Sequence, residues 1–145
     1  MKTYVLIVST SFPKSHPKVG TSTFFLKSIK EGKKIHTIRK NYDLWEKRIK
    51  EVQQGEAILS IRCWTGLPYK SPQQEFTQIT KEDLPAVEKV YHTPHGWYLN
   101  NTQELDTWAL ANNDGMKEYH FESWLKDPSS EPLAIIHFTS FRYLK

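Results

Sequence analysis

The densest cluster of residues able to do chemistry lies between residues 32 and 39, where the sequence reads GKKIHTIR. The glycine lets the backbone approach a ligand closely. A lysine supplies a positive charge, or a nucleophile when burial lowers its pKa. A threonine hydroxyl can orient or deprotonate that amine, and an arginine offers a planar fork to a phosphate or a base edge. The candidate ligand-binding residues here are Gly32, Lys33, Lys34, His36, Thr37 and Arg39.

A second group of candidate binding residues lies at and after the end of an apolar run at 56–64. The rings of Trp64 and Tyr69 can stack on a base. Arg62 precedes Trp64 by two residues, so both side chains share one face of the expected strand. Trp64 is also well placed to be a core residue that ends its strand, whereas Tyr69 lies in a polar loop, which favours a binding role.

The charge of the chain is unevenly distributed, and two interpretations of the basic half stay open. Residues 1–62 carry 13 Lys or Arg against 5 Asp or Glu, whereas residues 63–145 carry 7 against 11. A basic half suits an anionic partner such as RNA, DNA or a nucleotide. Solvated helix lysines explain the same excess, and the spacing of residues 32–39 also fits an exposed edge strand that lysines protect from aggregation.

The elements that must position these residues follow from the apolar periodicity and the turn signals. Strands are predicted at 4–9, 34–39, 56–64, 73–79 and 133–141, a hairpin at 87–100, and helices at 24–32, 41–54, 102–110 and 117–125. Asp114-Gly115 is interpreted as a break between the last two helices. Strands interrupted by helices at irregular intervals predict one α+β domain over residues 1–145, with a mostly antiparallel, barrel-like sheet.

Several classes of site and location are not favoured by the sequence. Cys63 is the only cysteine, so an internal disulfide and a cysteine-based zinc site are excluded, and we expect a reducing, cytoplasmic location. His92 and His95 lack the acidic or cysteine cluster of a metal site. Since no P-loop or dinucleotide fingerprint occurs, we expect no metal and no cofactor. No apolar run approaches the length of a membrane span.

The stretch 24–64 resembles the ASCH domain family, which has the PUA-like fold. In that family a helix leads into a G-x-K-x-x-T-x-R-type segment, and the matching residues here are Gly32, Lys34, Thr37 and Arg39. A Gly-acid-hydrophobic strand follows at 55–59, and residues 133–143 are similar to the last barrel strand of such proteins. The resemblance implies a PUA-like, mostly antiparallel β-barrel with flanking helices, which binds RNA or a nucleotide beside the motif.

A weaker resemblance links the chain to a short bacterial branch of that family, which hydrolyses acetylated cytidine. It implies that Lys34 is a nucleophile, that Thr37 activates it and that a downstream glutamate assists. No motif locates the glutamate, and the candidates are Glu75, Glu82 and Glu88. The chain departs from this branch by an inserted helix at 41–54 and by a longer segment at 91–132.

Three functions therefore remain open, with the oligomeric state undetermined. The leading hypothesis is a module that binds RNA or a nucleotide in a basic cleft around residues 32–39. The first alternative is a metal-independent amidohydrolase acting on an acylated nucleoside, and the second is a protein-interaction domain. A carboxylate within hydrogen-bonding reach of Lys34, in a pocket too small for RNA, would favour the hydrolase.

Overall fold

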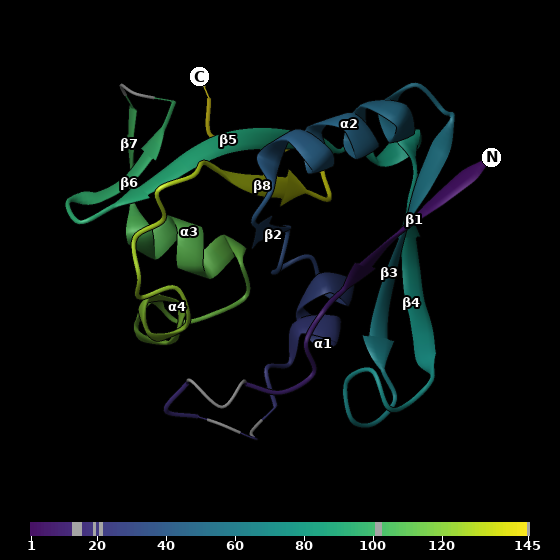
Figure 1. Ribbon diagram of the computed structural model, residues 1–145, viewed down its shortest axis with the longest axis horizontal. Helices are drawn as coiled ribbons and strands as arrows, with labels where there is room; N and C mark the ends of the chain where they lie inside the picture. The colour runs from purple at the N-terminus through teal and green to yellow at the C-terminus, as the bar shows by residue number, and fades with distance from the viewer. Residues whose placement is uncertain (13–15, 19, 21, 101–102, 145) are drawn as a thin grey trace.

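The computed structural model of the protein describes residues 1–12, 16–18, 20, 22–100 and 103–144. Within them, eight strands form two sheets, and four α-helices and one short 3-10 helix connect or cover the strands (Figure 1). The α+β class predicted from the sequence is confirmed. The elements are β1 (Lys2–Ile7), α1 (Phe25–Lys30), β2 (His36–Arg39), α2 (Tyr42–Gln53), β3 (Ala57–Trp64), β4 (Gln73–Ile79), the 3-10 helix η1 (Lys81–Asp83), β5 (Ala86–Thr93), β6 (Gly96–Leu99), β7 (Gln103–Leu105), α3 (Thr107–Asn113), α4 (Glu118–Trp124) and β8 (Leu133–His137).

The smaller sheet has the strand order β1-β3-β4. Strand β1 runs parallel to β3, with Lys2 opposite Ala57 and Ile7 opposite Arg62, and β3 pairs antiparallel with β4. Alternate residues of β3 are buried, because successive side chains of a strand point to opposite faces. The sheet thus presents one apolar face to the interior.

The larger sheet has the order β2-β8-β5-β6-β7, and all its pairings are antiparallel. Its β5–β6 hairpin confirms the hairpin predicted at 87–100. Among the described residues the pairings form two separate sheets rather than one closed barrel. The pairings are therefore mostly antiparallel, as predicted, but they do not by themselves show the barrel.

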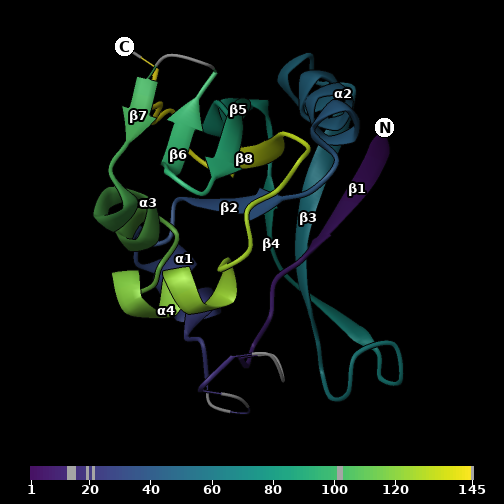
Figure 2. The ribbon, with the colours of Figure 1, turned by 60° about the vertical axis from the view of Figure 1, so that its left-hand side comes forward.

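Strand β8 separates two hydrophobic cores. Ala134 and Ile136 belong to the core shared with the smaller sheet and α2, and Leu133 and Ile135 belong to the core shared with α3 and α4. All four side chains are buried, which explains why this strand reads as a continuous apolar run. Figure 2 shows α2 near the smaller sheet and α3 with α4 at the opposite end of the molecule.

Several predicted elements differ in their bounds from the structure, and two of these differences are large. Within the predicted helix at 102–110, β7 forms first and α3 begins only at Thr107, because the Asp106 side chain caps that helix by accepting from the Trp108 amide. Residue 102 itself lies outside the described part of the chain. The strand predicted at 133–141 ends at His137. The longest helix in the described part of the chain, α2, has 12 residues. No helix among the described residues has the length and hydropathy of a membrane span.

Candidate functional site

The residues of the 32–39 motif divide into a buried set and an exposed one. Lys34, His36 and Thr37 are 2%, 0% and 3% exposed, whereas the Lys33 side chain is largely exposed and forms an ion pair with Glu31 at 3.1 Å. Strand β2 does lie at the edge of its sheet, but its side chains are covered. The interpretation of this segment as a solvated edge strand is therefore wrong, because the other elements pack over it.

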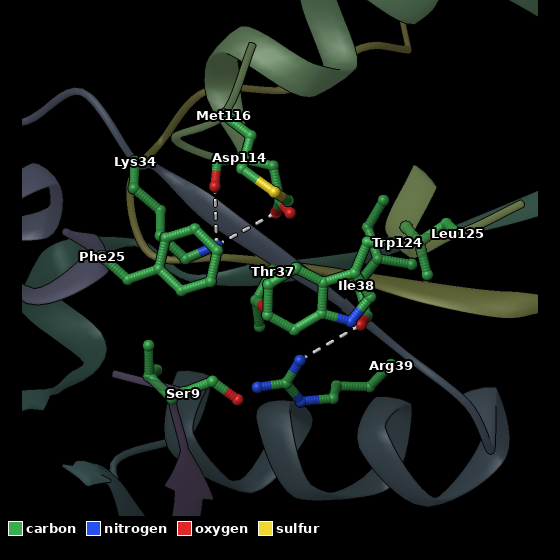
Figure 3. Close-up of a pocket in the computed structure, with 11 residues that line it drawn as sticks. Ser9, Phe25, Lys34, Thr37, Ile38, Arg39, Asp114, Met116, Trp124 and Leu125 are labelled. Atoms are coloured by element: carbon green, nitrogen blue, oxygen red, sulfur yellow. Dashed lines mark hydrogen bonds and ion pairs between the residues drawn. The ribbon is translucent and has the colours of Figure 1, made fainter. Parts of the chain in front are cut away.

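The buried amine of Lys34 contacts the turn between α3 and α4. Its Nζ donates to the backbone oxygen of Asp114 at 2.9 Å and lies 3.2 Å from Oδ1 of the same residue (Figure 3). The Nζ also lies 4.2 Å from the centroid of the Phe25 ring. Removing an ammonium from water is costly unless a charge and hydrogen bonds compensate, so the carboxylate of Asp114 is what makes this burial tolerable.

Burial sets the electrostatics of this pair. It lowers the pKa of Lys34, although the Asp114 charge opposes the shift. Burial alone would raise the pKa of Asp114, but the charge of Lys34 and the hydrogen bond from His36 outweigh it and hold the pKa below its ordinary value. The pair therefore combines a lysine that releases its proton more readily than usual with a carboxylate that stays ionised.

A cavity of about 50 Å³ adjoins this pair. One water needs roughly 10–15 Å³ of such volume, so the cavity holds a few waters or one small functional group. Thr37 and Arg39 line it together with Lys34 and Asp114, and Figure 3 shows these side chains with apolar neighbours around them. The guanidinium of Arg39 is held by a hydrogen bond to the Ile7 oxygen at 2.6 Å.

A larger groove of about 420 Å³ lies next to the cavity, and Met116 lines both. Aromatic and basic side chains dominate the groove. Its lining includes Phe12, Lys18, Phe24, Lys117 and His120. Phe24 is 65% exposed and has a positive φ of 58°, an unfavourable conformation for a bulky residue. The site thus consists of a small polar cavity beside a wider aromatic groove.

Local backbone bonds bring Lys34 and Asp114 together. Gly32 ends α1 with a φ of 74° that favours glycine, and its amide donates to the Ile29 oxygen. Three residues later the amide of Ile35 donates to the Asn113 oxygen at 2.8 Å. This bond fastens the segment before β2 to the end of α3, and it places Lys34 against the following residue, Asp114.

The second predicted group lies elsewhere in the structure. Arg62 donates to the Ser60 hydroxyl and to Gln73, both within the β3–β4 hairpin. The rings of Trp64 and Tyr69 are 5.1 Å apart near the tip of that hairpin, and Tyr69 is 89% exposed. Of the described residues that line the cavity, none belongs to this group. The structure thus separates the candidate residues into two sites.

The three candidate glutamates have partners other than Lys34. Glu75 accepts from the Ser60 hydroxyl, and Glu82 accepts from the Thr80 hydroxyl at 3.0 Å. Glu88 contacts His137 at 2.7 Å.

The carboxylate beside Lys34 belongs to Asp114, which the sequence analysis treated only as part of a helix break. The sequence did carry a signal for a role of Asp114. It precedes Gly115 at a helix end, and such a turn fixes the position of the acidic residue. Its pairing across 80 residues of sequence is a tertiary fact.

Comparisons of the chain with protein-family models, with curated proteins and with solved structures found no match.

Proposed function

We propose that the protein is a metal-independent hydrolase of small amides, with Lys34 as the reacting amine. The observation that carries this proposal is the contact of 3.2 Å between Lys34 Nζ and Asp114 Oδ1 beside a cavity of about 50 Å³. Such a cavity excludes a polynucleotide but admits an acyl group. The resemblance of residues 32–39 to the ASCH family supports the proposal. As part of it, we propose that the two sheets together correspond to the PUA-like fold.

The chemistry requires a neutral amine and a nearby proton acceptor. The Lys34 amine attacks the acyl carbon, Asp114 takes the proton that the amine loses, and the departing amine receives it as the C–N bond breaks. Water then attacks the acyl carbon, and Asp114 accepts a proton from that water. Asp114 passes this proton to the Lys34 nitrogen as its bond to the acyl carbon breaks, which releases the carboxylic acid and restores the amine. The Thr37 hydroxyl lines the same cavity and orients the amine.

We expect the two parts of the substrate to bind in the two parts of the site. The acyl group enters the small cavity at Lys34, and the amine portion lies in the groove beyond Met116. Phe12 and Phe24 line that groove and suit a planar ring, because aromatic side chains stack on bases and similar rings. The substrate class is therefore a small N-acyl amine with an aromatic or heteroaromatic ring, of which an acetylated nucleoside is one member.

The test is a chromatographic assay of amide hydrolysis with acetylated cytidine and a panel of related N-acyl amines. We expect product with the wild type and a loss of about 100-fold or more in Lys34→Ala and Asp114→Asn, in line with the contribution of a positioned acid or base. Lys33→Ala is the matched control, because Lys33 is adjacent but exposed and should leave turnover unchanged.

Three outcomes decide the proposal and its details. The absence of product with every substrate on the panel would overturn it. An acyl adduct on Lys34, found by peptide mass spectrometry after rapid quenching, would support the nucleophilic route. Turnover that depends on Lys34 but forms no adduct would instead assign this amine to proton transfer with water.

A second candidate function, RNA binding, is favoured by the exposed ring of Tyr69, which lies 5.1 Å from the Trp64 ring at an interplanar angle of 50°. Exposed aromatic side chains provide sequence-tolerant stacking for single-stranded nucleic acid. Here the contact surface is the β3–β4 hairpin tip rather than Lys34. If this proposal holds, Tyr69→Ala weakens salt-dependent binding of a labelled single-stranded RNA, whereas the exposed neighbour Leu67 tolerates substitution by alanine.

A further inference from the structure

A chain of buried hydrogen bonds extends from the reacting amine to the C-terminal segment. Oδ1 of Asp114 lies 3.2 Å from Lys34 Nζ and 3.0 Å from His36 Nδ1. On the other side of the imidazole ring, His36 Nε2 lies 2.6 Å from the Tyr143 hydroxyl. The amide nitrogen of Asn113 donates to the same hydroxyl at 3.0 Å. Five residues from three parts of the chain thus meet in one network.

The donors and acceptors of this network can be arranged in one consistent order. Because Asn113 donates to the Tyr143 oxygen, the hydroxyl proton is free to point at His36 Nε2. Nε2 then accepts, so the proton of the neutral imidazole lies on Nδ1 and is donated to Asp114. Burial raises the pKa of Tyr143, which keeps this hydroxyl protonated as a donor.

The C-terminal segment is itself fixed in place. Glu88 accepts from the backbone amide of Tyr143 at 2.7 Å and from that of Leu144 at 2.9 Å, and it also contacts His137. His137 lies directly opposite His36 in the β2–β8 pairing, with the two rings 5.6 Å apart. Glu88 of β5 therefore anchors the backbone of the segment that carries the Tyr143 hydroxyl.

We propose that His36 and Tyr143 are positioning residues for the Lys34 amine: the tyrosine hydroxyl holds His36 as the neutral Nδ1–H tautomer, and His36 aims the ionised Asp114 at Lys34. Neither residue touches the substrate. This inference rests on the proposed function of Lys34 as the reacting amine, and it adds the residues that tune that amine. Its logic is that of a catalytic base oriented by a further group.

The relay sets how strongly Asp114 holds a proton on Lys34. In the wild type, Oδ1 is shared between two donors, the His36 ring and the Lys34 amine. When His36 no longer donates, the whole carboxylate charge is available to the ammonium, which then retains its proton to a higher pH. The ionisable groups around the relay are Asp114, Arg39, Tyr143, His137 and, through His137, Glu88.

The test uses nuclear magnetic resonance on the whole chain, with ¹⁵N-labelled histidine and lysine. Imidazole nitrogen shifts report the tautomer of His36, and the Nζ shift reports the titration of Lys34, assigned by its absence in Lys34→Ala. In Tyr143→Phe we expect His36 to lose its single tautomer. The Lys34 midpoint should also rise by about one pH unit, the scale of a hydrogen bond to a charged group.

Two further variants separate positioning from mere folding. His36→Asn keeps an N–H near the position of Nδ1, so the Lys34 midpoint should stay at its wild-type value. His36→Leu removes this donor, so the Lys34 midpoint should rise. His137→Gln is the matched control, because it alters an equally buried histidine in the paired position without touching Asp114, and it should leave Lys34 unchanged.

The proposal is overturned if His36 in the wild type carries its proton on Nε2 or is a cation. A Lys34 midpoint that stays the same or falls in folded Tyr143→Phe would also overturn it. Neither the His36 tautomer nor the Lys34 midpoint depends on turnover. A failure to hydrolyse any amide would therefore count against the proposed function without deciding whether the relay exists.

Discussion

Gly115 packs against the side-chain stem of Lys34. Its φ is +82°, and a Cβ added there would lie 2.9 Å from the Cβ of Lys34. A contact below 3.0 Å forces one of the two groups to move. The residue before it, Asp114, needs this close approach, since its backbone oxygen and its carboxylate must both reach the Lys34 amine. The glycine therefore does more than form the turn after α3, because it allows Lys34 and Asp114 to approach each other closely.

The first prediction contrasts two glycines with similar backbone conformations. Gly32→Ala introduces only left-handed strain, about 1–2 kcal/mol, because nothing lies within 4 Å of its added Cβ. Gly115→Ala adds a clash with Lys34, so we expect a larger loss of unfolding free energy and a displaced Lys34 resonance. Urea titration and the lysine spectrum measure these effects. Equal losses in the two variants, with an unmoved Lys34, would contradict the assigned role of Gly115.

At the scale of elements, β8 is the strand on which both cores depend. Ile135 and Ile136 are both fully buried, and they point to opposite cores because adjacent strand residues face opposite sides. The same strand pairs with β2, which carries the site, and with β5, which carries Glu88. Damage to either core should therefore be transmitted to the whole sheet and to the site.

The second prediction is that Ile135→Ala and Ile136→Ala each lower the unfolding free energy by about 2–5 kcal/mol, the usual cost of such a cavity. Because one strand serves both cores, each variant should still unfold in a single transition by fluorescence and by circular dichroism. Leu67→Ala, at a 69% exposed position, is the control and should stay within about 0.5 kcal/mol. Two separated transitions in either core variant would show that the sheets are independent units.

At the scale of the whole molecule, buried ionisable groups make stability depend on pH. Burial lowers the pKa of His137 below its ordinary 6.5. For Glu88, burial opposes the shift, but hydrogen bonds from His137 and from two backbone amides hold its pKa below 4.5. Both folded-state values lie below the unfolded ones. Each group therefore contributes stability above its unfolded value, and this contribution is lost as the pH falls through the folded value.

The third prediction follows from that sign. Stability should decrease from about pH 6.5 downward, first through His137 and then, below about pH 4.5, through Glu88 and Asp114. Urea midpoints measured between about pH 7 and about pH 4 test this. His137→Gln keeps a donor toward Glu88 but does not titrate, so its curve should be flatter in the upper part of the range. A midpoint that rises on acidification would contradict the assignment.

The sequence by itself determined most of the elements and located the motif. Apolar periodicity predicted α2, the β5–β6 hairpin and the apolar run of β8, because those patterns follow from local geometry. The residue types of the 32–39 motif also selected Lys34, Thr37 and Arg39, which line one cavity in the structure. The three-residue strand β7 was missed, since so short a segment forms only by pairing with β6.

Only the tertiary structure decided which residues work together. The sequence treated His36 as a ligand-binding residue and Asp114 as part of a helix break, yet the fold buries both beside Lys34. The fold also places Tyr69 at the tip of the β3–β4 hairpin, away from Lys34. The physical reason is that burial and long-range pairing depend on how β2, α3 and the C-terminal segment pack. Contacts between residues about 80 positions apart leave no periodic trace in the sequence.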